Sequence, residues 1–279
     1  MGTASLGTLV TYNPWSVGPT ALLDDVAARF DELRVHHVAV VDGERRVIGM
    51  VSETDLLRAR QAQRVVVVGS GISDTDDAPP VFARDCMSRQ VFTISPTVEM
   101  AAALSLLLDR QVHALPVVAQ GRLVGMVSSR DFLREFSYGE LPGSRELVST
   151  LLTANPAPTL TSDATLDEAL LAMQEYGVSC LAVVQGDCPV GIVSQRDIVR
   201  ETCRLDQQAG DLQEVRPAPS IAQVIRKSPA VRGGQRLCEA AAVMVESDLP
   251  AVTVVNPSNE HVGLITEDDL LRVLYDAQA

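Results

Sequence analysis

The sequence predicts a mixed α/β (α+β) protein built from four copies of one β-α-β-β-α unit. An eight-residue pattern occurs four times: a glycine, two apolar residues, Ser or Thr, two variable residues, Asp and a further apolar residue. Each copy follows a stretch with helical apolar spacing and a pair of short apolar runs. Self-similarity at intervals of 66 to 76 residues indicates a repeat architecture. The pattern occupies residues 49–56, 125–132, 191–198 and 263–270.

The first unit shows how each element is predicted. An apolar stripe with spacings of three and four residues predicts an amphipathic helix. Two β-like runs, 38–41 and 47–51, flank an Asp-Gly turn at 42–43 and predict a pair of strands. Ser52 then opens a second helix. The stripe of the first helix consists of Leu23, Val26, Ala27, Phe30 and Leu33.

The other three units repeat these elements in the same order. In each unit a helical stripe precedes a strand, a turn and a second strand, and the Ser or Thr of the pattern opens the closing helix. The stripes fall within 100–107, 166–173 and 237–244, and the strand pairs are 115–118 with 123–127, 181–184 with 190–193, and 252–255 with 262–265.

Three connecting segments separate the units. Residues 59–84 contain a β-like run at 65–68 and then an acidic, proline-containing stretch at 74–80, which predicts an exposed loop. Linkers at 137–145 and 207–220 follow the second and third units, and we place the main domain boundary in the first of them because it is short and near mid-chain. The predicted domains are residues 1–138, with repeats at about 9–60 and 85–136, and residues 139–279, with repeats at about 148–203 and 221–276.

Composition and charge exclude several classes of function. The net charge of −13 and the pI near 4.7 argue against a general binder of nucleic acid or of anionic membranes, because such binding depends on clustered Lys and Arg. No apolar run approaches the roughly 20 residues of a membrane span, and the N-terminus does not read as a signal peptide. The five cysteines are odd in number and irregularly spaced, which favours a reduced, cytoplasmic setting over a disulfide framework.

The repeated unit, with its Gly-h-h-[Ser/Thr]-x-x-Asp-h ending, resembles the cystathionine-β-synthase (CBS) domain family. The resemblance covers nearly the whole chain outside the linkers, and four copies with their elements in order make it specific. In that family, two CBS units pack through their sheets into a Bateman module. The resemblance therefore implies four CBS repeats paired into two Bateman modules, units one with two and units three with four.

The Ser-x-x-Asp part of the pattern has a structural interpretation that needs no ligand. The hydroxyl accepts from free backbone N–H groups at a helix start, and the carboxylate suits the positive helix end. The same helix start is also a ready phosphate site, and the Asp can accept hydrogen bonds from a ribose diol. The resemblance implies these roles, Ser or Thr toward phosphate and Asp toward ribose. The residues are Ser52 with Asp55, Ser128 with Asp131, Ser194 with Asp197, and Thr266 with Asp269.

The resemblance also implies that the base enters a cleft supplied by the partner unit. Trp15 and Phe92 either stack on a base or fill and close that cleft. His36 and His113 match a column from which family members reach phosphate, or are simply solvated. The implied surroundings are Pro14, Trp15, Val35, His36 and His37 for Ser128, Val91, Phe92, Val112, His113 and Ala114 for Ser52, residues 157–158 and 178–180 for Thr266, and residues 228–229 and 249–251 for Ser194.

Two arginines distinguish the middle sites from the outer ones. Arg130 and Arg196 directly precede the motif Asp in units two and three, where the first and fourth units have Thr54 and Asp268. A guanidinium near a phosphate gives charge-assisted hydrogen bonds. We therefore expect units two and three to carry the better phosphate sites, unless both arginines point to solvent.

These observations predict a non-catalytic regulatory sensor that binds AMP, ADP or ATP and shifts between two module geometries. The alternatives are a ligand-free CBS scaffold that docks on a partner, or a binder of S-adenosylmethionine or a dinucleotide. An enzyme is disfavoured, because neither a catalytic constellation nor metal-ligand spacing accompanies the repeats, and Gly69-Ser-Gly71 lacks the third glycine of a dinucleotide turn. We expect no cofactor. The expected partners are an adenine nucleotide and an unidentified target protein, with a homodimer left open.

Overall fold

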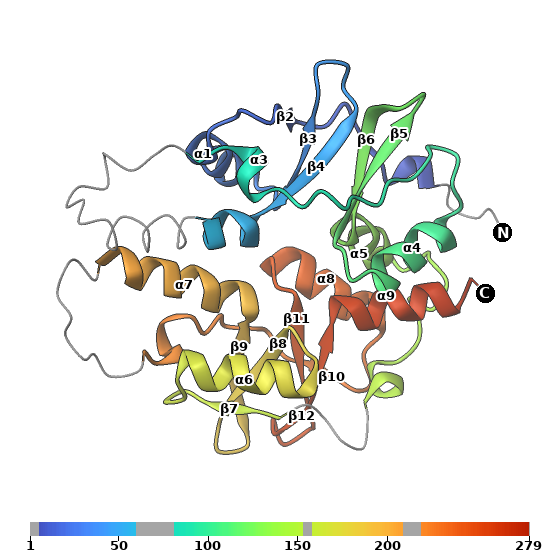
Figure 1. Cartoon of the computed structure of the whole chain (residues 1–279). Helices are drawn as coiled ribbons and strands as arrows, with labels where there is room; N and C mark the ends of the chain where they lie inside the picture. Colours follow the sequence, from blue (N-terminus) through green and yellow to red (C-terminus); the bar gives the residue numbers. More distant parts are fainter. Residues whose placement is uncertain (1–5, 60–80, 153–157, 209–218, 279) are drawn as a thin grey trace.

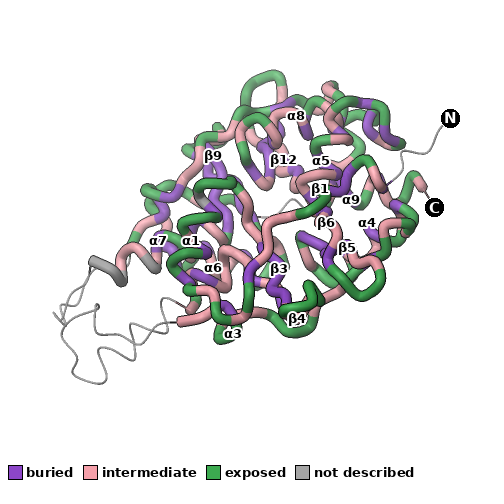
Figure 2. Tube along the Cα trace, turned by 90° about the horizontal axis from the view of Figure 1, so that it is seen from above, coloured by how far each residue is buried: buried purple, intermediate pink, exposed green. Residues whose placement is uncertain are grey.

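The computed structural model describes residues 6–59, 81–152, 158–208 and 219–278. It contains four small three-stranded sheets with helices in the repeated order, and the α+β fold class is confirmed. Units one and two form the upper half of the molecule in Figure 1, and units three and four form the lower half. Unit one lies above unit three, and unit two lies above unit four. In Figure 2 the buried segments lie mainly along strands, and the exposed segments lie mainly at the periphery.

The first two units exchange their leading segments. In unit one, β2 runs parallel to β3, and β3 pairs antiparallel with β4. The N-terminal strand β1 instead pairs antiparallel with β6 of unit two. The first part of the chain contains the 3-10 turn Leu6–Thr8, β1 (Thr11–Tyr12), β2 (Ser16–Val17), α1 (Leu23–Leu33), β3 (His37–Val41), β4 (Val47–Ser52) and a helix over 53–59. Unit two contains α3 (Ala83–Cys86), α4 (Met100–Asp109), β5 (Ala114–Ala119), β6 (Arg122–Ser128) and α5 (Ser129–Ser137).

Units three and four share one sheet topology, in which a two-residue strand runs parallel to the first strand of an antiparallel pair. Unit three contains the 3-10 turn Val148–Leu151, β7 (Leu160–Thr161), α6 (Leu166–Tyr176), β8 (Cys180–Gln185), β9 (Cys188–Ser194) and α7 (Gln195–Gln208). Unit four contains the 3-10 turn Ile221–Gln223, β10 (Val231–Arg232), α8 (Leu237–Ser247), β11 (Ala251–Val255), β12 (His261–Thr266) and α9 (Glu267–Asp276).

The sheets of paired units pack against each other through apolar faces. The β-strand periodicity of two puts alternate residues on this inner face, where small and β-branched side chains allow close approach. Unit one packs on unit two, and unit three on unit four, as the sequence predicts. The buried residues of these contacts are Ala39, Val41 and Leu123 in the first pair, and Cys180, Ile192, Leu249 and Ala251 in the second.

The glycine of each repeated motif lies where the leading segment of the partner unit crosses the sheet. Ile192 and Arg226 exchange backbone hydrogen bonds of 2.9 Å in both directions, and a Cβ on Gly191 would lie 2.5 Å from the carbonyl oxygen of Arg226. Only glycine leaves room for such an approach. The other close approaches of this kind join Gly49 to Met87, Gly125 to Val10, and Gly263 to Leu152. Every crossing residue belongs to the partner unit. The pairing of the units is therefore the reason that this motif position requires glycine.

One shared hydrophobic core joins the two halves of the molecule on the side of units two and four. Helices α4 and α5 pack on α8 and α9. The linker at 137–145 is part of this core, since Leu141 is 6% and Ser144 is 0% exposed. Because the core runs across the boundary between residues 138 and 139, that boundary stays a prediction. The largest buried side chains of the shared core include Leu104, Phe132, Phe136, Leu237 and Met244.

Units one and three each keep a separate hydrophobic cluster. Their facing helices, residues 53–59 and α7, instead approach each other with charged side chains. The expected β-like run at 65–68, the Gly69-Ser-Gly71 segment and the acidic loop at 74–80 lie outside the described residues, as does most of the linker at 207–220.

We predict that Gly191→Ala lowers the free energy of unfolding by about 1–3 kcal/mol, because its Cβ would overlap backbone atoms of the crossing segment. Gly49→Ala is the matched control, because its Cβ would meet chiefly the Sδ and Cγ atoms of the flexible Met87 side chain. Urea denaturation of both variants measures the difference. Equal losses, or a larger loss at Gly49, would contradict the assignment of Gly191 to a backbone crossing.

Candidate functional site

All four Ser/Thr-Asp pairs form helix N-terminal caps. The Ser128 backbone N–H donates to Asp131 Oδ2 at 2.8 Å, and the Ser128 hydroxyl donates to the same oxygen at 2.6 Å. The bonds at Ser52, Ser194 and Thr266 are equivalent, with hydroxyl-to-carboxylate distances of 2.6, 2.5 and 2.7 Å. The backbone N–H of the motif Asp also donates to the hydroxyl at Ser52, Ser194 and Thr266, each at 3.2 Å, and Ser128 forms a capping box with Asp131, so the capping interpretation is confirmed at each site. The cap uses the proton of each hydroxyl and the Oδ2 atom of each carboxylate, while Oδ1 of Asp131 accepts from Arg134 at 3.4 Å.

A cavity of about 410 Å³ lies beside the cap of unit three, where Asp197 is 9% exposed. Helix α7 supplies one wall, the segment before β10 and the end of α8 supply a second, and unit one contributes His36. The cavity thus brings together three of the four units. Its polar lining residues are His36, Arg196, Asp197, Arg200, Glu201, Arg204, Gln223, Arg226 and Asp248, and its apolar ones are Val224 and Ile225.

The arginines of this cavity have partners inside the protein. Arg204 donates to both carboxylate oxygens of Glu201, at 2.7 and 2.5 Å, and the hydrogen bonds from Arg204 lower the pKa of that carboxyl. Arg226 donates to the carbonyl oxygen of Ser247 at 3.3 Å. The remaining two lie against Glu53 of unit one, with Arg196 Nε 3.5 Å from Oε2 and Arg200 donating to Oε1.

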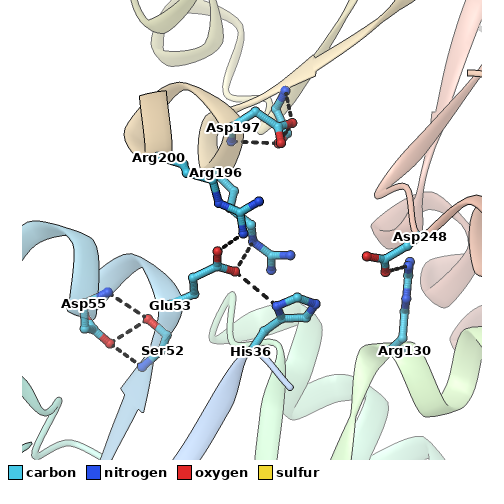
Figure 3. A network of polar contacts seen from close by, with 10 residues as sticks. His36, Ser52, Glu53, Asp55, Arg130, Arg196, Asp197, Arg200 and Asp248 are labelled. Carbon is cyan, nitrogen blue, oxygen red and sulfur yellow. Dashed lines mark hydrogen bonds and ion pairs between the residues drawn. The ribbon is translucent and has the colours of Figure 1, made fainter. Parts of the chain in front are cut away.

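Glu53 lies at the centre of a charged network shown in Figure 3. The Nδ1 atom of His36 lies 3.1 Å from Glu53 Oε2. Burial alone would raise the pKa of Glu53, but hydrogen bonds from His36 and Arg200, together with the charges of Arg200 and Arg196, lower it to about 2. The carboxylate therefore stays ionised throughout the physiological range.

Arg130, the other arginine expected near a phosphate, contacts unit four, and its phosphate role stays a prediction. It donates to the carbonyl oxygen of Leu249 at 2.9 Å and to the carboxylate of Asp248, and its Nη1 lies 3.8 Å from Glu267 Oε2. This side chain is 23% exposed, so it does not simply extend into solvent. Arg130 therefore spans the two halves, as Arg196 does on the other side.

The remaining expected site residues lie in the segments next to the strands, except Ala114, which is the first residue of β5. Trp15 packs edge-on against Phe30, with ring centroids 6.1 Å apart. The guanidinium of Arg110 lies over the ring of Phe92, with its Cζ atom 5.1 Å from the ring centroid. Val91 is half-buried, Ala114 is buried and pairs with Ser128 in the strand ladder, and His113 is exposed near the ring of His37.

Sequence reasoning missed several residues of the cavity. Arg200 and Arg204 follow Arg196 at intervals of four residues, which places all three on one face of a helix. That spacing was a usable signal. Arg226 and Asp248 carried no comparable signal, because unit four brings them to the cavity only through the packing of its sheet on unit three.

Two further searches of the described ranges gave negative results. Within residues 6–59, 81–152, 158–208 and 219–278, no group of three or more His, Cys, Asp or Glu side chains is arranged to hold a metal ion. In the same ranges, no helix is long and apolar enough to cross a membrane. The described cysteines, Cys86, Cys180, Cys188 and Cys238, are free thiols.

The CBS domain family model matches the chain at residues 6–62, 83–138, 148–203 and 221–276. These four matches cover most of the sequence, and the chain therefore belongs to the CBS domain family. The matched ranges also coincide closely with the four structural units.

Two relatives illustrate the extent of the similarity. The CBS domain-containing protein YhcV of Bacillus subtilis is 34% identical over 119 residues, which are 41% of this chain and 81% of that protein. A 33.4 kDa uncharacterized protein of Thermofilum pendens is 25% identical over 203 residues, 70% of this chain. The chain spans 63% of the length of that relative, which is less than two thirds.

Among solved structures, protein MJ1225 of Methanocaldococcus jannaschii superposes with a TM-score of 0.73 at 18% identity, covering 96% of this chain and 99% of that one. It is described as a candidate archaeal homologue of g-AMPK. At this level of identity the similarity shows a shared fold and no more, and the four-unit arrangement is part of that fold.

We predict that acid destabilises the protein through His37. Burial is the largest cause that lowers the pKa of His37 to about 3, and the charges of His113 and Arg196 add to it. His36 acts in the same direction, and Glu53 opposes it. Because the unfolded chain takes up this proton near pH 6.5 and the folded chain does not, stability is present above that pH and falls as the pH is lowered toward 3.

Between pH 7 and pH 5, this histidine should cost at most about 2 kcal/mol of unfolding free energy. Urea denaturation at the two pH values measures the loss in the unmodified chain and in His37→Gln. The variant should lose less stability on acidification. An identical pH dependence in both proteins would show that His37 titrates normally in the folded state.

Proposed function

We propose that this chain is a non-catalytic regulatory protein that binds an adenosine nucleotide, AMP, ADP or ATP, in the cavity at Asp197. The observation that carries the proposal is a cavity of about 410 Å³ whose lining includes four arginines, Arg196, Arg200, Arg204 and Arg226. In a chain with a net charge of −13, these guanidinium groups are local positive charges that an anionic ligand can share with their carboxylate partners. The volume also lies in the range of small-molecule sites, about 300–1,000 Å³.

The lining residues suit the three parts of a nucleotide. Asp197 keeps one carboxylate oxygen outside its cap, and this oxygen can accept hydrogen bonds from a ribose diol. Arg196 and Arg200 can give charge-assisted hydrogen bonds to phosphate. Val224 and Ile225 offer apolar contact for a purine. Because the lining comes from both halves of the molecule, a ligand that binds one arrangement of the halves more tightly would shift the protein toward it.

The proposal extends to the organisation and setting of the protein. We propose two Bateman modules at residues 1–138 and 139–279, a cytoplasmic location and an unidentified target protein. The four CBS matches, which span most of the residues given, support a regulatory role. The motif sites at Ser52, Ser128 and Thr266 stay predictions, and S-adenosylmethionine or a dinucleotide remains the alternative ligand.

A ligand-free scaffold is the second candidate, and one observation favours it. The motif hydroxyls already donate to their own Asp residues, and Arg196, Arg204 and Arg226 already have partners within the protein. A ligand would have to replace some of these contacts. Such self-sufficiency suits a protein whose modules only assemble or dock.

Calorimetric titration with AMP separates the two candidates. We predict that Asp197→Asn weakens the tightest binding step roughly tenfold or more, because a hydrogen bond to a charged group contributes about 1.5–3 kcal/mol. The variant keeps an acceptor oxygen for the cap, so folding should survive. Asp55→Asn is the matched control, since Asp55 makes the same cap but does not line this cavity.

Loss of the tightest step in Asp55→Asn and not in Asp197→Asn would place the site elsewhere. An unmodified chain that binds none of AMP, ADP, ATP and S-adenosylmethionine at millimolar concentration would favour the scaffold. Binding of S-adenosylmethionine alone would replace the nucleotide with the alternative ligand.

A further inference from the structure

Glu53 has polar partners from both halves of the molecule, two arginines of unit three and a histidine of unit one. We call Glu53, His36, Arg196 and Arg200 the Glu53 cluster. The carboxylate side chain is only 13% exposed, and both of its oxygens are engaged. Such a half-buried carboxylate needs paired charges, because losing them would leave it poorly solvated. Figure 3 shows Glu53 between the two arginines of α7 and the imidazole of its own unit.

Among the residues that the structure describes, the cluster lies on the side of the molecule where no hydrophobic core joins the two halves. On the side of units two and four, one hydrophobic core runs through both halves. The clusters of units one and three do not merge in this way, and each stays within its own half. The contact between helix 53–59 and α7 therefore depends strongly on the charges of the Glu53 cluster, whereas the other side is held by buried apolar surface.

Three members of the cluster also line the proposed ligand cavity. His36, Arg196 and Arg200 face it, whereas Glu53 itself is outside its lining. The Glu53 carboxylate therefore pairs with Arg196 and Arg200 from outside the cavity. A phosphate inside the cavity would need the same two guanidinium groups. Carboxylate and phosphate compete for the same donors, since both accept charge-assisted hydrogen bonds from Arg.

We infer that Glu53 is a displaceable internal anion, which occupies Arg196 and Arg200 in the empty protein and gives them up when a phosphate enters the cavity. Its release loosens unit one from unit three while the core between units two and four holds. This inference rests on the proposed ligand site and adds how occupancy changes the protein. A phosphate carries more negative charge than the carboxylate it replaces, which supplies the differential affinity that such a shift requires.

The equivalent contact on the other side provides a natural comparison. Glu267 follows Thr266 as Glu53 follows Ser52, and it lies 3.8 Å from Arg130 across the halves. Glu267 does not contact an arginine of the cavity, and its surroundings include the shared core. Removing its charge should therefore leave both ligand binding and the contact between units one and three unchanged.

The test uses Glu53→Gln and Glu267→Gln in the full chain, with AMP, adenosine and inorganic pyrophosphate as probes in calorimetric titrations. Glu53→Gln should bind AMP and pyrophosphate about tenfold more tightly than the unmodified chain. Adenosine, which has no phosphate, should bind both proteins equally. Glu267→Gln should behave as the unmodified chain toward all three probes.

Amide hydrogen exchange supplies a second readout, in the unmodified chain and in Glu53→Gln. Pyrophosphate should speed exchange of the amides in 53–59 of the unmodified chain, and Glu53→Gln should show the faster exchange without ligand. Unchanged or weaker binding of pyrophosphate to Glu53→Gln would overturn the inference, as would slower exchange in 53–59 on binding. If pyrophosphate binds Glu53→Gln more tightly than the unmodified chain while AMP binds neither protein, the inference about Glu53 holds and the nucleotide proposal fails. Binding of neither probe to either protein overturns both.

Discussion

The close crossing of each leading segment over the motif glycine of its partner unit is the constraint on which the rest of the structure depends. At Gly191 the crossing residue is bonded through its backbone to the neighbouring Ile192, so the two units are joined at a fixed register. The same glycine lies three residues before Ser194, which starts the helix of the motif. The crossing therefore brings the leading segment of one unit next to the helix start of the other. A cavity at that junction is a consequence of how the repeats pair.

The charges at the two variable positions of the motif acquire meaning only when the halves are together. In isolation, the glutamates of units one and four disfavour a phosphate, and the arginines of units two and three favour one. In the folded protein they are complementary partners, since Glu53 meets Arg196 and Glu267 approaches Arg130. The two contacts nevertheless differ, because one is backed by a hydrophobic core and the other borders a cavity. Our proposal places the action of a ligand on the side of units one and three because the cavity borders that contact.

Local chemistry explains what the sequence could predict. Apolar periodicity located helices and strands, and capping chemistry located the helix starts, because both depend on residues close in the chain. The partners of Arg130 could not be predicted in this way, since Asp248 lies 118 residues further on and meets it only through packing of the two halves. The pairing of β1 with unit two was missed for the same reason. The cavity could be predicted in part, because the sequence alone shows the four-residue spacing of the arginines on α7.

A crystal structure of the full chain grown with saturating AMP would show whether the nucleotide displaces Glu53. We expect density for the nucleotide in the cavity of unit three, with the ribose hydroxyls on Asp197 and the phosphate on Arg196 and Arg200. We also expect Glu53 to have moved away from both arginines. Nucleotide bound at another motif, or a cavity left empty with Glu53 still paired, would contradict the proposal.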